Sequence, residues 1–361
     1  MIRVGIVSQY FWKHSVWDAL LKGWILQLDR SRISIHAFYL GTRHDAETVL
    51  AKAHAAYFRQ GPLDLRQWVE AIMDEQLDVI IYPEVGMDPL TAQLAALRLA
   101  PVQVATWGHP ETTGLSTIDY YLSAELFEPP SAQEHYTEQL ILLPHLGSSY
   151  TRTSIAPVAP DLQSLGIDAG AALLVCPGVP FKYAPAYDRV LAEIASKLGR
   201  CQLIFFTHRL SHLSEKLRQR IAIAFGLRGL AADDFVTFIP WQDTARFFGL
   251  LERADVFLDT IGFSGFNTAM QAVECGIPIV TRESAFLRGR LASGILKRLG
   301  LSELIAQSEA EYVAIAVQLA QDAMYRAHIR ERIAQSRQVL FENAAPIRAM
   351  EAFFSEVVLH R

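Results

Sequence analysis

The stretch that decides the fold is ADVFLDTIGFSGFNT, residues 254–268. Its apolar run at 256–259 is typical of a short buried strand, and its last residues are typical of a helix start. The loop between them contains glycine, which tolerates sharp turns and close backbone approach. A strand that leads through such a loop into a helix is the repeating unit of a parallel α/β sheet.

The same alternation of short apolar runs and amphipathic stretches extends over the whole chain. Strands are predicted at 4–8, 33–39, 79–82, 102–106 and 120–123, and again at 173–176, 203–207, 235–239, 256–259 and 277–281. Helices are predicted in the gaps, and from about residue 315 to the end. One helix has a single apolar stripe, formed by Leu65, Trp68, Val69, Ile72 and Met73. The fold class is therefore α/β.

The alternation lapses between about residues 150 and 171, where prolines oppose helix formation. A chain of 361 residues also exceeds what one core usually serves. We expect a Rossmann-like domain at 1–155, a second at 156–340, and a C-terminal helix at 341–361 that packs back on the first. Two doubly wound domains that face a cleft are typical of a two-substrate protein.

Composition excludes several classes of protein. The chain is 51% hydrophobic and 20% charged, with a formal net charge of -5, so a nucleic-acid partner is not expected. No uninterrupted apolar run is long enough for a membrane span. The three cysteines have neither metal-ligand nor disulfide spacing, which favours a reducing compartment, and we expect a cytoplasmic protein.

The helix start at 265–268 is the first candidate binding site. Its unpaired N–H groups and the positive end of the helix dipole can hold a diphosphate. Gly265 lets the backbone approach a ligand, and Asn267 and Thr268 can add donors. An ordinary helix N-cap explains the same residues equally well.

Lys182 follows the first strand of the second domain and is the second candidate. At the carboxyl edge of a sheet, a lysine can neutralise phosphates and stabilise a departing nucleotide. A solvated surface lysine is the commoner alternative.

Two histidines follow strands of the first domain, His14 after the first strand and His109 after the fourth. Either can accept an acceptor's proton or orient a substrate hydroxyl, and a hydrogen-bonded structural histidine is the alternative. Glu84 is a weaker candidate, and Asp88 before Pro89 is typical of a helix cap. No Ser-His-Asp order, DxD metal site, Walker loop or dinucleotide GxGxxG stands in the right context, so no metal or cofactor is expected.

Taken together these motifs resemble the catalytic region of the O-GlcNAc transferase and SPINDLY-like family of inverting GT-B glycosyltransferases, which includes adhesin-modifying N-glucosyltransferases. The pieces that match are the strand 4–8 with His14, 100–103 leading into GHPETTG at 108–114, IDY at 118–120, Lys182, 254–260, Asn267 with Thr268, and FLRGR at 286–290.

The resemblance implies a GT-B fold and a UDP-sugar donor. It implies that His14 and His109 face the acceptor and the sugar, and that Lys182 and the helix start hold the diphosphate. The implied donor-binding residues are Lys182, Gly265, Phe266, Asn267, Thr268, Gln271 and Arg288. Two of them depart from the family: Gln271 replaces a frequent acidic residue, and Phe266 replaces the histidine of animal members.

The predicted function is inverting, metal-independent transfer of GlcNAc or glucose from a UDP-sugar to Ser/Thr or Asn of a protein. The alternatives are a glycan or small-molecule acceptor, a nucleotide-sugar epimerase, and a non-catalytic nucleotide-sugar-binding subunit. The His109 motif is closer to bacterial members, so the sugar stays open. The chain contains no helical repeat array, so a missing helical domain or a separate partner is expected to recognise the acceptor.

Overall fold

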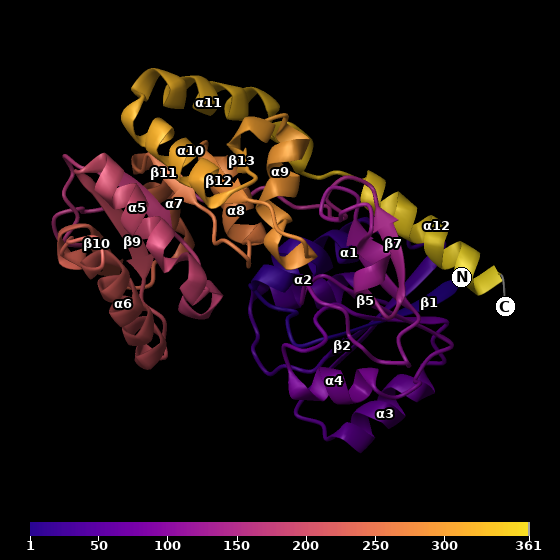
Figure 1. The fold of residues 1–361 in the computed structure, drawn as a ribbon. Helices are drawn as coiled ribbons and strands as arrows, with labels where there is room; N and C mark the ends of the chain where they lie inside the picture. The colour runs from indigo at the N-terminus through magenta and orange to yellow at the C-terminus, as the bar shows by residue number, and fades with distance from the viewer. Residues whose placement is uncertain (360–361) are drawn as a thin grey trace. The chain divides into compact units, whose positions relative to one another are not determined.

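The computed structural model describes residues 1–359, which form two compact α/β units (Figure 1). Unit 1 consists of Met1–Thr151 and the segment from Leu340, and unit 2 is Arg152–Val339. Residues 152–160, which join them, have no regular secondary structure. The predicted divisions at 155 and 340 lie close to these.

Unit 1 contains a seven-stranded parallel sheet in the order β3-β2-β1-β4-β5-β6-β7. The strands are β1 (Ile2–Ser8), β2 (Ile33–Tyr39), β3 (Tyr57–Gln60), β4 (Val79–Tyr82), β5 (Val102–Thr106), β6 (Tyr120–Ala124) and β7 (Gln139–Leu143). The two strands that were not predicted, β3 and β7, are the edges of the sheet. Both are largely half-buried. The strand β3 contains Arg59 and Gln60 and so lacks a continuous apolar run, whereas β7 contains the apolar run 140–143 and was overlooked.

The helices of unit 1 are the π-helix η1 (Trp17–Leu21), α1 (Lys22–Gln27), α2 (Ala46–His54), α3 (Leu65–Asp74), α4 (Pro89–Ala95), the short 3-10 helix η2 (Ala132–His135) and α12 (Ala345–Leu359). The predicted stripe lies on α3, where Trp68 and Ile72 are fully buried but Met73 is exposed. Prediction of a helix in every gap is wrong for residues 107–119, which join β5 to β6 without a helix.

The C-terminal helix α12 packs on unit 1, beside β1 and β7 (Figure 1). Ile347, Met350 and Phe354 are fully buried, and burial of each such side chain contributes about 1.5–3 kcal/mol. The Phe353 ring meets the Tyr120 ring edge-on, with centroids 5.1 Å apart. Apolar burial therefore holds this helix on unit 1.

Unit 2 contains a six-stranded parallel sheet in the order β10-β9-β8-β11-β12-β13. Its strands are β8 (Ala172–Cys176), β9 (Cys201–Phe206), β10 (Val236–Ile239), β11 (Val256–Leu258), β12 (Ile279–Arg282) and β13 (Ile305–Ala306). Its α-helices are α5 (Asp188–Leu198), α6 (Ser211–Gly226), α7 (Thr244–Arg253), α8 (Phe266–Cys275), α9 (Leu291–Leu299), α10 (Glu309–Gln321) and α11 (Ala323–Ser336).

Two expectations for unit 2 are wrong in detail. The strand predicted at 277–281 begins at Ile279, because Gly276 is left-handed and the Ile277 N–H closes the end of α8 by donating to the Ala272 carbonyl. The final helical region begins at Glu309, not after residue 315, and the two-residue strand β13 precedes it.

Both sheets reverse their strand order between two central neighbours. In unit 1 the reversal falls between β1 and β4, and in unit 2 between β8 and β11. Open α/β sheets bind ligands outside the carboxyl ends of the strands at such a point. The loops that follow these four strands are therefore the place to look for functional groups.

Candidate functional site

The loop after β11 is held in place by Asp259, a buried carboxyl at its start. Its oxygens accept hydrogen bonds from the Ser264 hydroxyl at 2.7 Å, the Thr281 hydroxyl at 2.7 Å and the Gly265 N–H at 3.0 Å. Burial raises the pKa of Asp259, and these hydrogen bonds oppose that shift. One side chain thereby fixes the whole turn that leads into α8.

Gly265 is the N-cap of α8 and has no side chain to cap it. The preceding residue, Ser264, directs its hydroxyl to Asp259 and not to the helix. A Cβ atom at position 265 would lie 2.4 Å from the Thr268 Oγ1, so the backbone here tolerates only glycine without a shift. The helix therefore has a glycine N-cap, and no N-cap side chain reaches the first N–H groups of α8.

The other candidate donor-binding residues lie around this helix start. Among the described residues the Asn267 Oδ1 is buried without a hydrogen-bond partner. Gln271 lies one helical turn further on the same face of α8. The Arg288 carbonyl accepts from the Ser264 N–H at 2.7 Å, which places Arg288 beside the loop. Phe266 is buried and packs into the core of the unit.

Lys182 ends the short 3-10 helix η3 (Pro180–Lys182) after β8. Its Nζ lies 4.3 Å from the centroid of the Phe263 ring, which belongs to the loop after β11. Burial lowers the pKa of Lys182 to about 8, and the charge of Asp259 opposes the shift. Lys182 is thus a desolvated ammonium group at the loop rather than a solvated surface lysine, and an anion bound beside it would raise its pKa.

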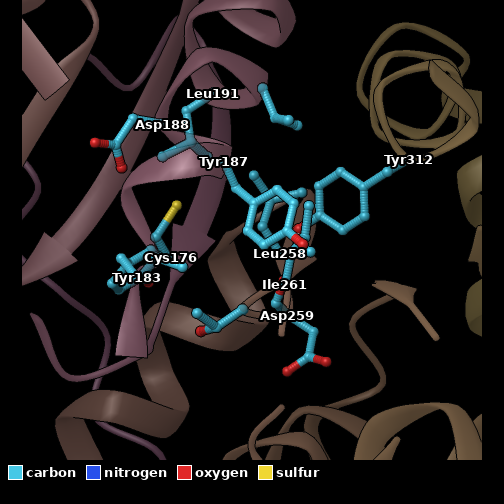
Figure 2. Close-up of a pocket in the computed structure, with 12 residues that line it drawn as sticks. Cys176, Tyr183, Tyr187, Asp188, Leu191, Leu258, Asp259, Ile261 and Tyr312 are labelled. Atoms are coloured by element: carbon cyan, nitrogen blue, oxygen red, sulfur yellow. The ribbon is translucent and has the colours of Figure 1, made fainter. Parts of the chain in front are cut away.

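Figure 2 shows a small pocket in unit 2 next to this loop, lined among others by Tyr187, Leu191, Leu258, Ile261 and Tyr312. Its volume of ≈ 20 Å³ is enough for about one water molecule. In Figure 2 the Asp259 carboxylate points away from the Tyr187 and Tyr312 rings. This pocket is too small to hold a sugar nucleotide.

His14 follows β1 in unit 1, and its ring stacks on the Tyr10 ring with centroids 3.9 Å apart. Its Nδ1 accepts a hydrogen bond from the Val16 N–H at 3.2 Å. Burial, assisted by the charge of Arg43, lowers the pKa of His14 to about 4. The ring is therefore neutral, and since Nδ1 is an acceptor, the proton is on Nε2. Of the two roles predicted for it, this geometry favours orienting a hydroxyl over accepting a proton.

His109 follows β5, and its ring rests against Gly86. That glycine has φ of +102°, and a Cβ there would lie 3.0 Å from the His109 Cδ2. The His109 Nε2 is 3.8 Å from a carboxylate oxygen of Glu111. Burial lowers the pKa of His109, and Glu111 opposes the shift. Of the two predicted histidines, His109 is the better suited to accept a proton.

Glu84 follows β4, directly across the strand-order reversal from the loop after β1. It is fully buried, and its Oε1 accepts from the Gln9 N–H at 2.9 Å. Burial raises the pKa of Glu84 to about 8. Within residues 1–359 its Oε2 has no hydrogen-bond partner. The neighbouring Asp88 caps α4 by accepting from the Thr91 N–H at 2.8 Å, so the predicted helix cap is confirmed.

The predicted residues therefore divide between the two units. Lys182 joins the α8 start in unit 2, and His14 and His109 lie after strands of unit 1. Asp259 and Glu84 carry more of the local geometry than the sequence indicated. The signal for both was an acidic residue one or two positions after a wholly apolar strand. In the described part of the chain, no cluster of three His, Cys, Asp or Glu side chains suits a metal ion. No helix there has the length and apolar character needed to cross a membrane.

Comparison with known proteins supports the resemblance. Residues 240–346 match the family described as glycosyl transferase family 41. The probable UDP-N-acetylglucosamine–peptide N-acetylglucosaminyltransferase SPINDLY of Solanum lycopersicum is 27% identical over 97% of this chain, which spans only 38% of that protein. The UDP-glucose:protein N-beta-glucosyltransferase of Actinobacillus pleuropneumoniae serotype 5b is 24% identical over 75% of this chain and 43% of its own length.

Two solved structures show the fold. A mutant of the O-GlcNAc transferase of Thermobaculum terrenum matches 99% of this chain and 68% of its own, with a TM-score of 0.87 and 24% identity. A sucrose-phosphate synthase of Thermosynechococcus elongatus matches with a TM-score of 0.62 and 13% identity. These likenesses confirm the predicted GT-B fold class. The chain is thus similar to the family 41 glycosyltransferases over residues 240–346, and to O-GlcNAc transferase and SPINDLY proteins over most of its length.

Proposed function

We propose that this chain is the catalytic region of a protein glycosyltransferase that uses a UDP-sugar. The reaction is inverting and needs no metal ion, and it moves GlcNAc or glucose to a Ser/Thr hydroxyl or an Asn amide. The observation that carries the proposal is the meeting of Lys182 with the loop after β11 at the start of α8. The matches to UDP-GlcNAc and UDP-glucose transferases support the choice of donor.

On the donor side, the bond between the anomeric carbon and the diphosphate oxygen breaks, and negative charge grows on the departing UDP. The Lys182 ammonium and the uncapped N–H groups of α8 are suited to receive this charge. The Lys182 ammonium is already desolvated and the N–H groups are already fixed by the helix, so neither group needs to reorganise much as the sugar–phosphate bond breaks. They supply the electrostatic stabilisation that a metal ion supplies in other enzymes.

On the acceptor side, the nucleophile attacks the anomeric carbon opposite the departing UDP, which inverts the configuration, and the nucleophile loses its proton. His14, as a neutral Nε2–H donor, is suited to orient a hydroxyl of the sugar or acceptor. His109 is neutral near pH 7 because burial lowers its pKa, so it can accept a proton.

The acceptor is proposed to be recognised in part by residues outside this chain, either a further domain or a separate partner. The chain spans 38% of the SPINDLY relative, which leaves most of that protein unmatched. The sugar, the linkage and a cytoplasmic location remain predictions.

A thermal-shift panel with UDP-GlcNAc, UDP-glucose, UDP and GDP-fucose tests the donor site. A ligand present at 1,000 times its Kd stabilises the folded state by about 4 kcal/mol. We expect UDP and the UDP-sugars to raise the Tm of the wild type but not of Lys182→Ala. The matched control is Lys216→Ala, which removes an exposed lysine of the same unit.

Transfer is then measured with a UDP-sugar and Ser-, Thr- or Asn-containing peptides. Sugar transfer that survives Lys182→Ala would contradict the assigned role of this lysine. Conversion of the UDP-sugar without any acceptor would identify an epimerase instead. Tight UDP binding with no turnover on any acceptor would identify a binding subunit.

A further inference from the structure

The connection that carries His109 has few main-chain hydrogen bonds of its own. Residues 107–119 run from β5 to β6 without a helix, although parallel strands are usually joined by one. Within this connection the main chain forms bonds from Glu111 to His109 and from Ile118 to Leu115. Buried main-chain groups without a helical ladder need other partners. Side chains from elsewhere in unit 1 supply further hydrogen bonds to this loop.

Glu138, the residue before β7, holds the middle of the loop. It is 2% exposed, and its Oε2 accepts from the Thr112 hydroxyl at 2.7 Å. Its Oε1 accepts from the Thr113 N–H at 2.8 Å and from the Thr113 hydroxyl. Burial opposes its charge, but the hydrogen bonds from Thr113 and Thr112 outweigh burial, and the pKa of Glu138 is lowered. One carboxylate thus binds three donors of two consecutive residues.

His109 is close to this clamp in sequence and is held by two further contacts. The Tyr121 hydroxyl donates to the His109 carbonyl at 3.0 Å, and the ring lies against Gly86. Tyr121 is on β6, and its register partner on β7 is Leu140, two residues after Glu138. The loop is therefore bound to β6 through Tyr121 and to the start of β7 through Glu138. Both strands lie on the opposite side of β5 from β4, the strand that Glu84 follows.

We infer that Glu138 is a positioning residue that fixes the His109 loop through Thr112 and Thr113. Its role in catalysis rests on the proposed function, but its hold on His109 does not. All three groups that face the carboxylate donate to it here: the Thr113 N–H, which can only donate, and the hydroxyls of Thr112 and Thr113. In Glu138→Gln one of the two acceptor oxygens becomes an NH2 group, which cannot accept from Thr112 or Thr113. The loop is then expected to loosen and His109 to become more exposed to water.

The experiment uses the full chain with 13C-labelled histidine, and NMR follows the titration of the His109 and His14 rings. A His109→Gln variant assigns the His109 signal. In Glu138→Gln we expect the pKa of His109 to rise toward its ordinary value, since burial lowers it in the wild type, while the pKa of His14 stays unchanged. The matched control is Glu134→Gln, an exposed glutamate of η2 that lies close to Glu138 in sequence.

An unchanged His109 titration in Glu138→Gln would overturn the inference. If that variant does not fold, Thr113→Val removes one of the three donors and keeps the carboxylate, and the same shift is expected in smaller form. In the transfer assay, Glu138→Gln should lower kcat by roughly 10- to 100-fold with little change in the donor KM. A raised KM with unchanged kcat contradicts the positioning role. If the wild type has no transferase activity, the proposed function is wrong. The titration of His109 in Glu138→Gln still shows whether Glu138 positions His109.

Discussion

Glu84→Gln is the sharpest test of the electrostatics of unit 1. Burial raises the pKa of Glu84 from 4.5 to about 8, so the folded protein keeps this carboxyl protonated near neutral pH. The unfolded chain releases the proton near pH 4.5. Between these two values the folded state binds more protons than the unfolded state, and stability falls as the pH rises. Glutamine keeps an acceptor for the Gln9 N–H and removes the titration.

The size of the effect follows from the shift in pKa. Each unit corresponds to 1.36 kcal/mol, so the rise from 4.5 to about 8 corresponds to at most about 5 kcal/mol. The whole stability of a domain is about 5–15 kcal/mol, so this term is large. Below pH 4.5 the wild type carries no penalty from Glu84, and above pH 8 the penalty is complete. The glutamine amide adds a cost of its own, which does not depend on pH.

The assay is urea unfolding of the wild type and Glu84→Gln at several pH values from 4.5 to 8.5. Tryptophan fluorescence reports mainly on unit 1, because Trp241 alone of the six tryptophans lies in unit 2. Groups that titrate in both proteins contribute equally to the two unfolding free energies, so their contributions cancel in the difference. We expect it to move in favour of Glu84→Gln by several kcal/mol as the pH rises. A difference that stays constant across this range would refute the neutral carboxyl.

Three further outcomes are expected. Gly265→Ala should weaken UDP binding measured by calorimetry while changing Tm little, because the new Cβ displaces the Thr268 hydroxyl. The affinity for UDP should be level below pH 8 and fall by up to tenfold per pH unit above it, because the donor binds the charged form of Lys182, whose pKa is about 8. In Lys182→Met this fall in affinity above pH 8 should be absent. Phe354→Ala should cost about 3–5 kcal/mol in urea unfolding, because this side chain of α12 is fully buried.

The central strands could be predicted from the sequence because they are buried on both faces. β1, β4, β5 and β8 appear as short apolar runs bounded by polar or turn residues. The edge strand β3 could not, since it is half-exposed, contains Arg59 and Gln60, and resembles a loop. The helix-free connection at 107–119 was missed because its order depends on Glu138, a residue distant in sequence. Tertiary hydrogen bonds of this kind leave no periodic signal.

The candidate residues could be predicted as separate loops, but not their contacts. Lys182 and the α8 start were each ambiguous alone, and each had a common structural explanation. The order of the strands adds what each loop alone lacks, because it makes β8 and β11 neighbours and so brings Lys182 to Phe263. Strand order depends on pairing across the whole unit, which a local pattern does not contain.

Both strand-order reversals have a buried acidic residue at the same position, but its surroundings differ between the two units. Each has a buried acidic residue after the strand that follows the reversal, Glu84 in unit 1 and Asp259 in unit 2, and each accepts from a loop N–H. Asp259 has three donors and the Lys182 ammonium nearby, so its charge can be tolerated beside a site for an anion. Within residues 1–359 Glu84 has one oxygen without a hydrogen-bond partner, and no cation is among the groups that shift its pKa, so the fold favours its neutral form. At the same position, the Asp259 carboxylate balances the charge of Lys182 in unit 2, while the neutral Glu84 carboxyl links two loops in unit 1.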